Sequence, residues 1–593
     1  MFRSLQLSFY RPLKRQILTP PPIRHKQTFF IPARFRNAPR PVKIMPQHKK
    51  QKKGRNFERD RANGFDEVLQ ADVDRLIQEQ QSDTNTPPAD ASNPSKAALP
   101  EAFTEIEVTV SEISSTGDGL ALSENGDHVF VVPFTVPGDK VLVKVVRHFP
   151  TLNYTMTDFV KVIESGQQRK DELIGCKYFG KCSGCQLQMM SYEDQLAHKK
   201  RIVEKAYANF SGLIPELIPA IEDTFASPLR YGYRTKLTPH FSVPGGRSRS
   251  KNKERESTTE VPAIGYTYKN QRRNLDIEDC PLGTDVVREG LKTERKNVVK
   301  NLHKYKSGAT ILLRETTARL PKEGSDASSN PAFPITYDTK NKPEQESGDV
   351  VRVERENYLE EKRCVTDSNA TSVEYIDDYL FTNKAGAFFQ NNNSILSGFT
   401  EYIRQHALAP PPSSSASPST PSAPTKKEPS PIKYLLDAYS GSGLFTITLS
   451  PLFKSSLGVD VAGDSIVSAR LNARMNSLQN TGFAAADATT LFGDVPYPPN
   501  QTLLVIDPPR KGCSDDFLRQ MLEYGPRRVV YVSCNVHTQA RDVAVMVQGD
   551  EKLGIRYDIE SIRGFDFFPQ TGHVEGVAIL NKVSIPKAEE KSA

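Results

Sequence analysis

Cys534 is the residue of this chain whose type and position are best suited to covalent chemistry. It stands in the segment Ser533-Cys534-Asn535, directly after the apolar, β-branched run Val529–Val532. Such a run predicts a buried strand that delivers the thiol to the rim of a sheet. A thiol at the end of a strand is, however, more often a core residue than a nucleophile. A catalytic interpretation therefore needs a second reacting group and a place for a cofactor.

The second group is Glu575. It lies between the loop Phe565–Gln570 and the apolar run Val577–Leu580, which predicts a carboxylate near the same rim of the sheet as Cys534. These two side-chain types suit one reaction on a uracil ring, whose C5 is a poor nucleophile. A thiolate that attacks C6 makes C5 electron-rich enough to take a methyl group. A base must then remove the C5 proton before the thiol can leave.

Three further strand ends predict a site for a nucleotide-type cofactor. The run Tyr434–Asp437 opens into the glycine turn Ala438–Gly443, where backbone N–H groups can come close to a ligand. Asp460 ends the next apolar run and suits the two hydroxyls of a ribose. Asp487 ends a third run, from which a carboxylate can reach an adenine amino group. The turn and the two acids together are a stronger indication than the turn alone.

The motif Asp507-Pro508-Pro509-Arg510 separates the two cofactors that share this pattern, nicotinamide dinucleotides and S-adenosylmethionine (SAM). It follows the apolar run Leu503–Ile506, and its prolines hold a loop extended beside a flat substrate. No group of residues in the sequence resembles a hydride-transfer site. The order of the motifs therefore favours a SAM-dependent methyltransferase that forms a covalent bond to its substrate.

The composition narrows the class of protein further. With 593 residues the chain is too long for a single core, and 37% hydrophobic residues with 43 prolines indicate long polar segments. No run of about 18 apolar residues is present, so we expect no contact with a membrane. The seven cysteines, an odd number, argue against a disulfide framework and for a reducing compartment.

Positive charge is concentrated at the N-terminus. Residues 1–57 hold 15 Lys and Arg and no acid. The net charge of the whole chain is +7, so the net charge of the remaining residues is −8. Any nucleic-acid surface of the folded part must therefore be a local patch.

The first 15 residues combine spaced arginines with apolar residues, which is typical of a mitochondrial presequence, although Pro12 interrupts the helix. We predict a mitochondrial address, and the cluster Lys49–Arg55 makes the nucleus or cytoplasm, or a basic RNA-binding arm, the alternative.

The pattern of strands and helices that must position the reacting groups predicts an α/β protein with several domains. Short alternating runs predict a small antiparallel, OB-type β-barrel near the N-terminus. After Ile432 strands and helices alternate, as in a doubly wound, Rossmann-like parallel sheet. Three polar interruptions, 245–259, 321–349 and 409–433, are expected to be solvated insertions. The predicted order is a basic segment (1–57), a helix and linker (58–102), the barrel (103–165), a mixed α/β central domain (166–408), a Pro/Ser-rich linker (409–431) and the Rossmann-like domain (432–585).

Four cysteines of the predicted central domain have the spacing of metal ligands. Cys176, Cys182 and Cys185 lie close together, and Cys280 follows later in the chain. Thiolates at such spacing bind zinc or an iron–sulfur cluster, and the spacing alone does not choose between them. Four thiols without any ligand are the third alternative.

The segment Arg230–Lys236 alternates basic and aromatic residues. This pattern is typical of a surface that stacks bases and contacts phosphates. An amphipathic strand with solvated charges explains it equally well. A uracil must leave its base stack to reach Cys534, so the proposed chemistry implies base flipping.

Taken together, the motifs resemble the tRNA/rRNA (uracil-5-)-methyltransferase family, and within it a eukaryotic, fungal tRNA member. The similarity covers residues 103–582 apart from the three insertions, and the barrel is similar to the RNA-binding TRAM module. The matching segments are Phe388-Phe-Gln-Asn391, Asp437-Ala-Tyr-Ser-Gly-Ser-Gly443, Asp507-Pro-Pro-Arg-Lys-Gly512, Ser533-Cys-Asn535 and His573-Val-Glu575.

Carried over residue by residue, the resemblance implies that Cys534 is the nucleophile and Glu575 the proton acceptor. It implies SAM as the cofactor, tRNA as the partner and a T-loop uridine as the target, and we expect a monomer. The residues implied in binding or positioning SAM are Gln390, Tyr439, Asp460, Asp487 and Asp507. The resemblance also favours a [4Fe–4S] cluster, because bacterial members of the family hold one on the pattern of Cys176, Cys182, Cys185 and Cys280.

Two positions depart from the family pattern. Val536 stands where proline usually follows Ser-Cys-Asn, and Ser440 stands where cysteine is common in the glycine turn. Neither position is a reacting group, so these departures put the rigidity of the loops in question and not the activity.

Two other functions remain open. A cytosine-C5 methyltransferase also uses a cysteine, but there a Pro-Cys motif is expected in place of Ser533-Cys534. A tRNA-binding chaperone with the same fold would need no chemistry. The intact pair of Cys534 and Glu575 argues against a loss of catalysis, though not against an added chaperone role.

Overall fold

A computed structural model describes residues 65–83, 99–243, 261–322, 347–408 and 431–586. The predictions made for the basic segment 1–57, including its targeting, lie outside these residues. So do most of the linker after the first helix and most of the three insertions. Residues 347–349, which the sequence assigned to the second insertion, begin strand β14 (Ser347–Glu354). In this described part of the chain, no helix is long and apolar enough to cross a membrane.

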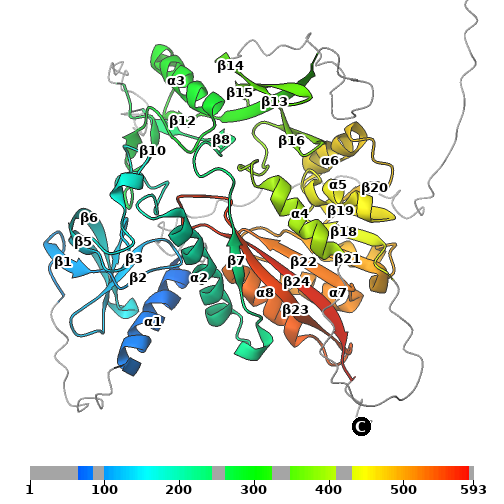
Figure 1. The fold of residues 1–593 in the computed structure, drawn as a ribbon, viewed down its shortest axis with the longest axis horizontal. Coiled ribbons are helices and arrows are strands. Elements are labelled where there is room, and N and C mark those ends of the chain that lie inside the picture. Colours follow the sequence, from blue (N-terminus) through cyan, green and yellow to red (C-terminus); the bar gives the residue numbers. More distant parts are fainter. Residues whose placement is uncertain (1–64, 84–98, 244–260, 323–346, 409–430, 587–593) are drawn as a thin grey trace, which may run out of the picture. The chain divides into compact units, whose positions relative to one another are not determined.

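A curled six-stranded sheet follows helix α1 (Phe65–Asp83) (Figure 1). Val108, Ala121, Val132 and Val143 from four strands meet in one core, as expected for a barrel. The strand order is β1-β5-β6-β4-β3-β2, and β4 and β6 run parallel, so the prediction of a purely antiparallel barrel is wrong at this pair. The chain crosses from β4 to the far side of β6 before it enters β5, and β6 then returns beside β4. The strands are β1 (Glu105–Thr109), β2 (Glu112–Ile113), β3 (Gly119–Leu122), β4 (Val129–Val132), β5 (Lys140–Phe149) and β6 (Tyr154–Glu164).

The central region combines one long helix with several small sheets. Helix α2 (Tyr192–Phe210) is capped by Ser191, whose hydroxyl accepts a hydrogen bond from Asp194 N at 3.1 Å. Leu237 and Leu313 pack with helix α3 in a core of their own. The other elements are β8 (Lys236–Leu237), β9 (His240–Ser242), β10 (Gly265–Thr267), β11 (Asn274–Asp276), α3 (Asp285–Lys300), β12 (Gly308–Thr310), β13 (Leu313–Pro321), β15 (Tyr358–Val365), β16 (Thr371–Ile376) and β17 (Tyr379–Lys384).

The C-terminal sheet has eight strands in the order β20-β19-β18-β21-β22-β24-β23-β7, and the first five are parallel. Adjacent residues of a strand point to opposite faces. Leu435 therefore packs with α4, α5 and α6, whereas Leu436 packs with α2, α7 and α8. Helices on both faces confirm the doubly wound, Rossmann-like fold (Figure 1). The elements are α4 (Leu396–Ala407), β18 (Tyr434–Ala438), α5 (Leu444–Thr448), β19 (Ser455–Asp460), α6 (Gly463–Met475), β20 (Thr481–Ala485), β21 (Thr502–Ile506), α7 (Asp515–Tyr524), β22 (Arg528–Ser533), α8 (Val536–Gln548), β23 (Ile555–Phe565) and β24 (Glu575–Ser584).

One edge of this sheet differs from the predicted parallel arrangement. The long hairpin of β23 and β24 adds antiparallel strands next to β22. The edge strand beyond it is β7 (Glu222–Phe225), which the sequence assigned to the central domain. Its partner β23 lies about 340 residues later in the chain, as the contact between Asp223 and Arg563 shows. The sequence pattern of a four-residue strand is too short to predict pairing with a strand so distant in the chain.

Candidate active site

The strand ends at one rim of the C-terminal sheet bring the predicted reacting groups together. β21 and β22 are parallel neighbours, and Asp507 and Cys534 directly follow their last residues. On the other side of β22, Ser533 pairs with Gly576 of β24, so Glu575 opens that strand beside Cys534. Asp507, Cys534 and Glu575 therefore lie at the same rim, on three adjacent strands.

These three groups influence one another electrostatically. Burial raises the pKa of Glu575 to about 7, although the charge of Arg510 opposes the shift. Burial, with the charges of Glu575 and Asp507, raises the pKa of the Cys534 thiol to about 11. Burial and the charges of Glu575 and Asp437 also raise the pKa of Asp507 well above its usual range. Near neutral pH the carboxyl group of Glu575 is thus close to its midpoint, which suits a group that must accept a proton and release it again.

Arg510 is the cation that favours the thiolate at this rim. Its charge and a hydrogen bond from its side chain both lower the pKa of Cys534, against the raising effect of burial. The loop that carries it is fastened to the turn of the cysteine, because Arg510 O accepts from Asn535 Nδ2 at 3.0 Å and from Thr538 Oγ1 at 3.1 Å. Arg510 is part of the motif Asp507-Pro508-Pro509-Arg510, but no role was predicted for it from the sequence. The presence of an arginine in a motif next to an acid, with a second acid and a thiol predicted at the same rim, was the signal that could have indicated its role.

The turn that holds Cys534 is closed by its neighbours. Ser533 Oγ accepts from Asn535 N at 3.0 Å, and Asn535 Oδ1 accepts from His537 N at 3.2 Å and so caps α8. Val536 is therefore the first residue of α8. Proline is common at this helix position because the N–H group that it lacks has no partner inside the helix. Valine occupies the same position with the cap formed, so the departure from the family pattern does not disturb the turn.

The glycine turn after β18 is organised by two acids. Buried Asp437 accepts from Thr446 N at 2.9 Å and from Thr446 Oγ1 at 2.6 Å, which ties the strand end to α5. Asp460 accepts from Gly441 N at 2.9 Å and from Ala462 N at 2.7 Å. Gly441 has a φ of +54°, and a Cβ atom at this position would meet open space. The turn thus leaves room in front of its backbone, as a nucleotide-type ligand requires.

Two other predicted cofactor residues lie around this turn. Tyr439 has a φ of +65°, and its ring packs 5.5 Å from the ring of Phe517. Asp487 is exposed just after β20. Burial, followed by the charges of Cys513 and Asp487, raises the pKa of Tyr439.

Gln390 comes from the central region, in the loop before α4, and is 7% exposed. Two residues later, Asn392 Nδ2 donates to Phe567 O at 3.1 Å. Asn391 O accepts from Thr235 N at 2.9 Å. The loop that carries Gln390 is therefore fastened to the segment that leads into Glu575.

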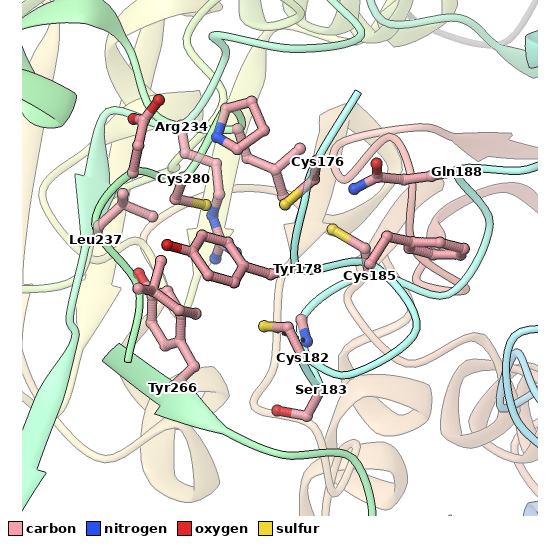
Figure 2. A pocket seen from close by; sticks show the side chains of 16 residues that line it. Cys176, Tyr178, Cys182, Ser183, Cys185, Gln188, Arg234, Leu237, Tyr266 and Cys280 are labelled. Atoms are coloured by element: carbon pink, nitrogen blue, oxygen red, sulfur yellow. Dashed lines mark hydrogen bonds between the residues drawn. The ribbon is translucent and has the colours of Figure 1, made fainter. Parts of the chain in front are cut away.

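The four predicted ligand cysteines line one pocket. Figure 2 shows Cys176, Cys182, Cys185 and Cys280 around it, with Arg234 in its wall. The cavity of about 110 Å³ is several times larger than the roughly 10–15 Å³ that a single water needs. All four are free thiols, and burial raises the pKa of Cys182 to about 11. Several soft donors around one space, with a cation beside them, fit a group that binds through thiolates.

The basic and aromatic segment Arg230–Lys236 is only partly available to RNA. Tyr233 is buried, and its hydroxyl donates to Pro569 O at 3.0 Å. The expectation that the aromatic residues stack bases is therefore wrong for Tyr233, because its ring fills the interior beside the loop that precedes Glu575. Arg230 is exposed and lies 4.4 Å from the ring centre of Tyr192.

The sheet, the open glycine turn and the thiol beside them define a Rossmann-like methyltransferase domain, which follows a small barrel in the sequence. Family profiles agree with this class: the description "tRNA (Uracil-5-)-methyltransferase" matches residues 499–583, and a TRAM domain matches residues 101–148. The chain belongs to the tRNA (uracil-5-)-methyltransferase family, as the similarity to fungal relatives shows. The predicted family and the TRAM-like barrel are thereby confirmed.

Two of these relatives are yeast proteins named tRNA (uracil(54)-C(5))-methyltransferase. The relative from Schizosaccharomyces pombe is 43% identical over 82% of this chain and 79% of its own length. The relative from Saccharomyces cerevisiae is 40% identical over 80% of this chain and 73% of its own length. Among solved structures, the tRNA (uracil-54, C5)-methyltransferase of Pyrococcus abyssi in complex with S-adenosyl-L-homocysteine superimposes with a TM-score of 0.52. It is 21% identical and covers 80% of this chain and all of its own, which supports the fold.

Proposed function

We propose that the protein methylates C5 of a uridine in tRNA, with SAM as the methyl donor, and that the target is uridine 54 in the T-loop. The observation that carries the proposal is the meeting of Asp507, Cys534 and Glu575 on three adjacent strand ends beside the open glycine turn. The names of the two yeast relatives support the choice of tRNA and of position 54.

The chemistry of the protein's own residues follows from their positions. Cys534, as a thiolate stabilised by Arg510, adds to C6 of the flipped uracil, and the electrons of the C5–C6 double bond move towards C5. When bound, SAM would supply an electrophilic methyl group. The electrons at C5 would form the new bond to this methyl group while its bond to the sulfonium sulfur breaks and leaves that electron pair on sulfur. Glu575 then accepts the proton from C5, the electrons of that C–H bond restore the double bond, and the electrons of the C6–S bond return to sulfur.

We assign SAM binding to the residues around the glycine turn. Asp460, fixed by two backbone N–H groups, offers its remaining lone pairs to the ribose hydroxyls. Tyr439 and the exposed Asp487, which follow the ends of β18 and β20, would contact the adenine. Gln390 and Asp507 would position the methyl donor towards the uracil.

A tRNA that carries 5-fluorouridine at position 54 tests this function. Fluorine in place of the C5 hydrogen cannot be removed as a proton, so the methylated adduct should stay bound to the protein. We expect a SAM-dependent complex that survives a denaturing gel. A complex with 5-fluorocytidine tRNA instead would favour cytosine methylation, and tight tRNA binding without any adduct would favour a chaperone.

We further propose that Cys176, Cys182, Cys185 and Cys280 hold a [4Fe–4S] cluster. In the described residues, no three His, Cys, Asp or Glu side chains come close enough to hold one metal ion. Support for the proposal comes from the four free thiols that line one cavity. Arg234, whose charge lowers the pKa of Cys280 against the raising effect of burial, is placed to balance the negative charge of such a group.

Protein purified without oxygen should therefore be brown and contain iron and sulfide in equal amounts. Replacing Cys182 with Ser should remove the colour and destabilise the central region, because metal binding contributes folding free energy. The matched control is Cys364→Ser, since Cys364 is buried in the same region but does not line the pocket. Stoichiometric zinc, or colour that survives the Cys182 change, would overturn the cluster.

A further inference from the structure

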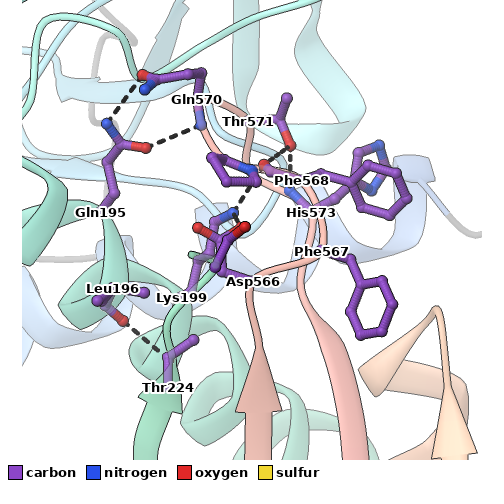
Figure 3. A network of polar contacts seen from close by, with 12 residues as sticks. Gln195, Leu196, Lys199, Thr224, Asp566, Phe567, Phe568, Gln570, Thr571 and His573 are labelled. Atoms are coloured by element: carbon purple, nitrogen blue, oxygen red, sulfur yellow. Dashed lines mark hydrogen bonds and ion pairs between the residues drawn. The ribbon is translucent and has the colours of Figure 1, made fainter. Parts of the chain in front are cut away.

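The loop between β23 and β24 is held almost entirely by residues from the N-terminal half of the chain. Figure 3 shows Lys199 and Gln195 of α2 reaching into it. Lys199 Nζ forms an ion pair with Asp566, and both side chains are fully buried. Lys199 Nζ also donates to Phe568 O at 3.0 Å. The loop, residues 566–574, leads directly into Glu575, the first residue of β24.

Four consecutive carbonyl groups of this loop accept hydrogen bonds from four separate segments. Phe567 O accepts from Asn392, Phe568 O from Lys199 and Pro569 O from Tyr233, at 3.1, 3.0 and 3.0 Å. The fourth carbonyl, that of Gln570, accepts from the backbone N–H groups of Gln186 and Leu187 at 2.9 and 3.1 Å. Because these four carbonyl groups of the loop are all hydrogen-bonded, the loop keeps one conformation for as long as these donors stay in place.

Gln195 fixes the most unusual residue of the loop. Gln570 has a φ of +71°, a backbone conformation that residues other than glycine rarely adopt. Gln195 Nε2 donates to Gln570 Oε1 at 3.1 Å, and Gln570 N donates to Gln195 Oε1 at 3.0 Å. This pair of reciprocal hydrogen bonds offsets the cost of the backbone conformation.

We propose that Lys199 and Gln195 of α2 are positioning residues for Glu575, and that the step they serve is removal of the C5 proton. This inference rests on the proposed function. Neither residue touches the rim itself; both act through the loop that leads into β24. Cys534 lies between the end of β22 and Asn535, the cap of α8, and in the described part of the chain no hydrogen bond joins the loop to either of them. Loosening the loop should therefore impair proton removal and leave thiol attack and methyl transfer nearly unchanged.

The experiment uses the full chain with Lys199→Met and Asp566→Asn combined, so that no unpaired charge is left buried. With SAM and unmodified tRNA, we expect methylated RNA to remain covalently bound and kcat to fall roughly 100-fold, the scale of a misplaced catalytic group. The KM for tRNA and the affinity for SAM should stay within about twofold of wild type, on the same reasoning. If the double variant does not fold, Gln195→Met decides the question by the same readout. This change removes the two hydrogen bonds with Gln570 and one to Met190 O, and no charge.

The matched control is Arg528→Met combined with Glu560→Gln. This ion pair, 2.6 Å long, is buried in the same sheet, but at the far end of β22 from Cys534. The control should lower thermal stability without trapping RNA. Equal behaviour of the two pairs, or loss of kcat without trapped RNA in the α2 variants, would overturn the inference. Absence of the 5-fluorouridine adduct in the wild-type protein would instead overturn the proposed function.

Discussion

Replacing Cys534 with alanine is expected to abolish both methyl transfer and the covalent RNA adduct, while SAM still binds. The thiol acts on the base, and the glycine turn that faces the cofactor is built from other strands. We expect the turnover number to fall by roughly 10³-fold or more, the scale seen when a covalent nucleophile is removed. The measurements are methyl incorporation into tRNA, a denaturing gel with 5-fluorouridine tRNA, and SAM binding by calorimetry.

Cys364→Ala is the control for the loss of a thiol as such. Cys364 is 4% exposed in the core of the central region, far along the chain from the rim. This variant should keep the adduct and the turnover of the wild type, with only a small loss of stability. Turnover that persists in the Cys534 variant would remove Cys534 from the mechanism.

Glu575→Gln is expected to stop the reaction at a different point. The amide keeps the size of the side chain but cannot accept a proton, so the variant should attack and methylate the uracil and then remain attached to it. Turnover should fall by about 10²- to 10⁴-fold, the usual contribution of a general base. The trapped RNA should contain a methyl group from SAM even when no fluorine is present.

The pH profile gives this assignment a second readout. Only the ionised form of Glu575 accepts a proton, and burial raises the pKa of Glu575 to about 7 while Arg510 lowers it. Release of methylated RNA by the wild type should therefore slow as the pH falls below about 7, and the Gln variant should lack this acid limb. The neighbours that face the carboxyl group are Asp507, Cys534 and Arg510. A Glu575 variant that forms no adduct would show that the residue has another role, and Glu560→Gln in the same hairpin controls for the loss of one carboxylate.

The parts of the site that could be predicted from sequence are those in which a local pattern ends at a chemical group. Each apolar run that ends in Asp437, Asp460, Asp507 or Cys534 is a strand of the sheet, and parallel strands bring their ends to one rim. The placement of Glu575 beside Cys534 needed more, namely the antiparallel hairpin that follows α8. The sequence indicated a strand there but not its direction.

The supports of the site could not be predicted in the same way. Lys199 and Asp566 meet across 367 residues, and no local pattern distinguishes a lysine that will be buried from one on a helix surface. The same holds for Tyr233, whose neighbours Arg230 and Lys236 suggested an exposed segment. Whether such a side chain is buried depends on how distant segments pack together. The spacing of residue types along a single sequence does not reveal that packing.

The edge strand β7 has a consequence for the synthesis of the protein. The ribosome releases β7 long before β23, its partner in the sheet, so the nascent chain must carry an unpaired edge through most of translation. Pairing across such a separation is slow and exposes the chain to misassembly. Glu575 is translated directly after β23, in the same hairpin that covers β7. A chain released early would therefore lack both the closing strands and the proton acceptor, so an incompletely folded product could not complete the reaction and release methylated RNA.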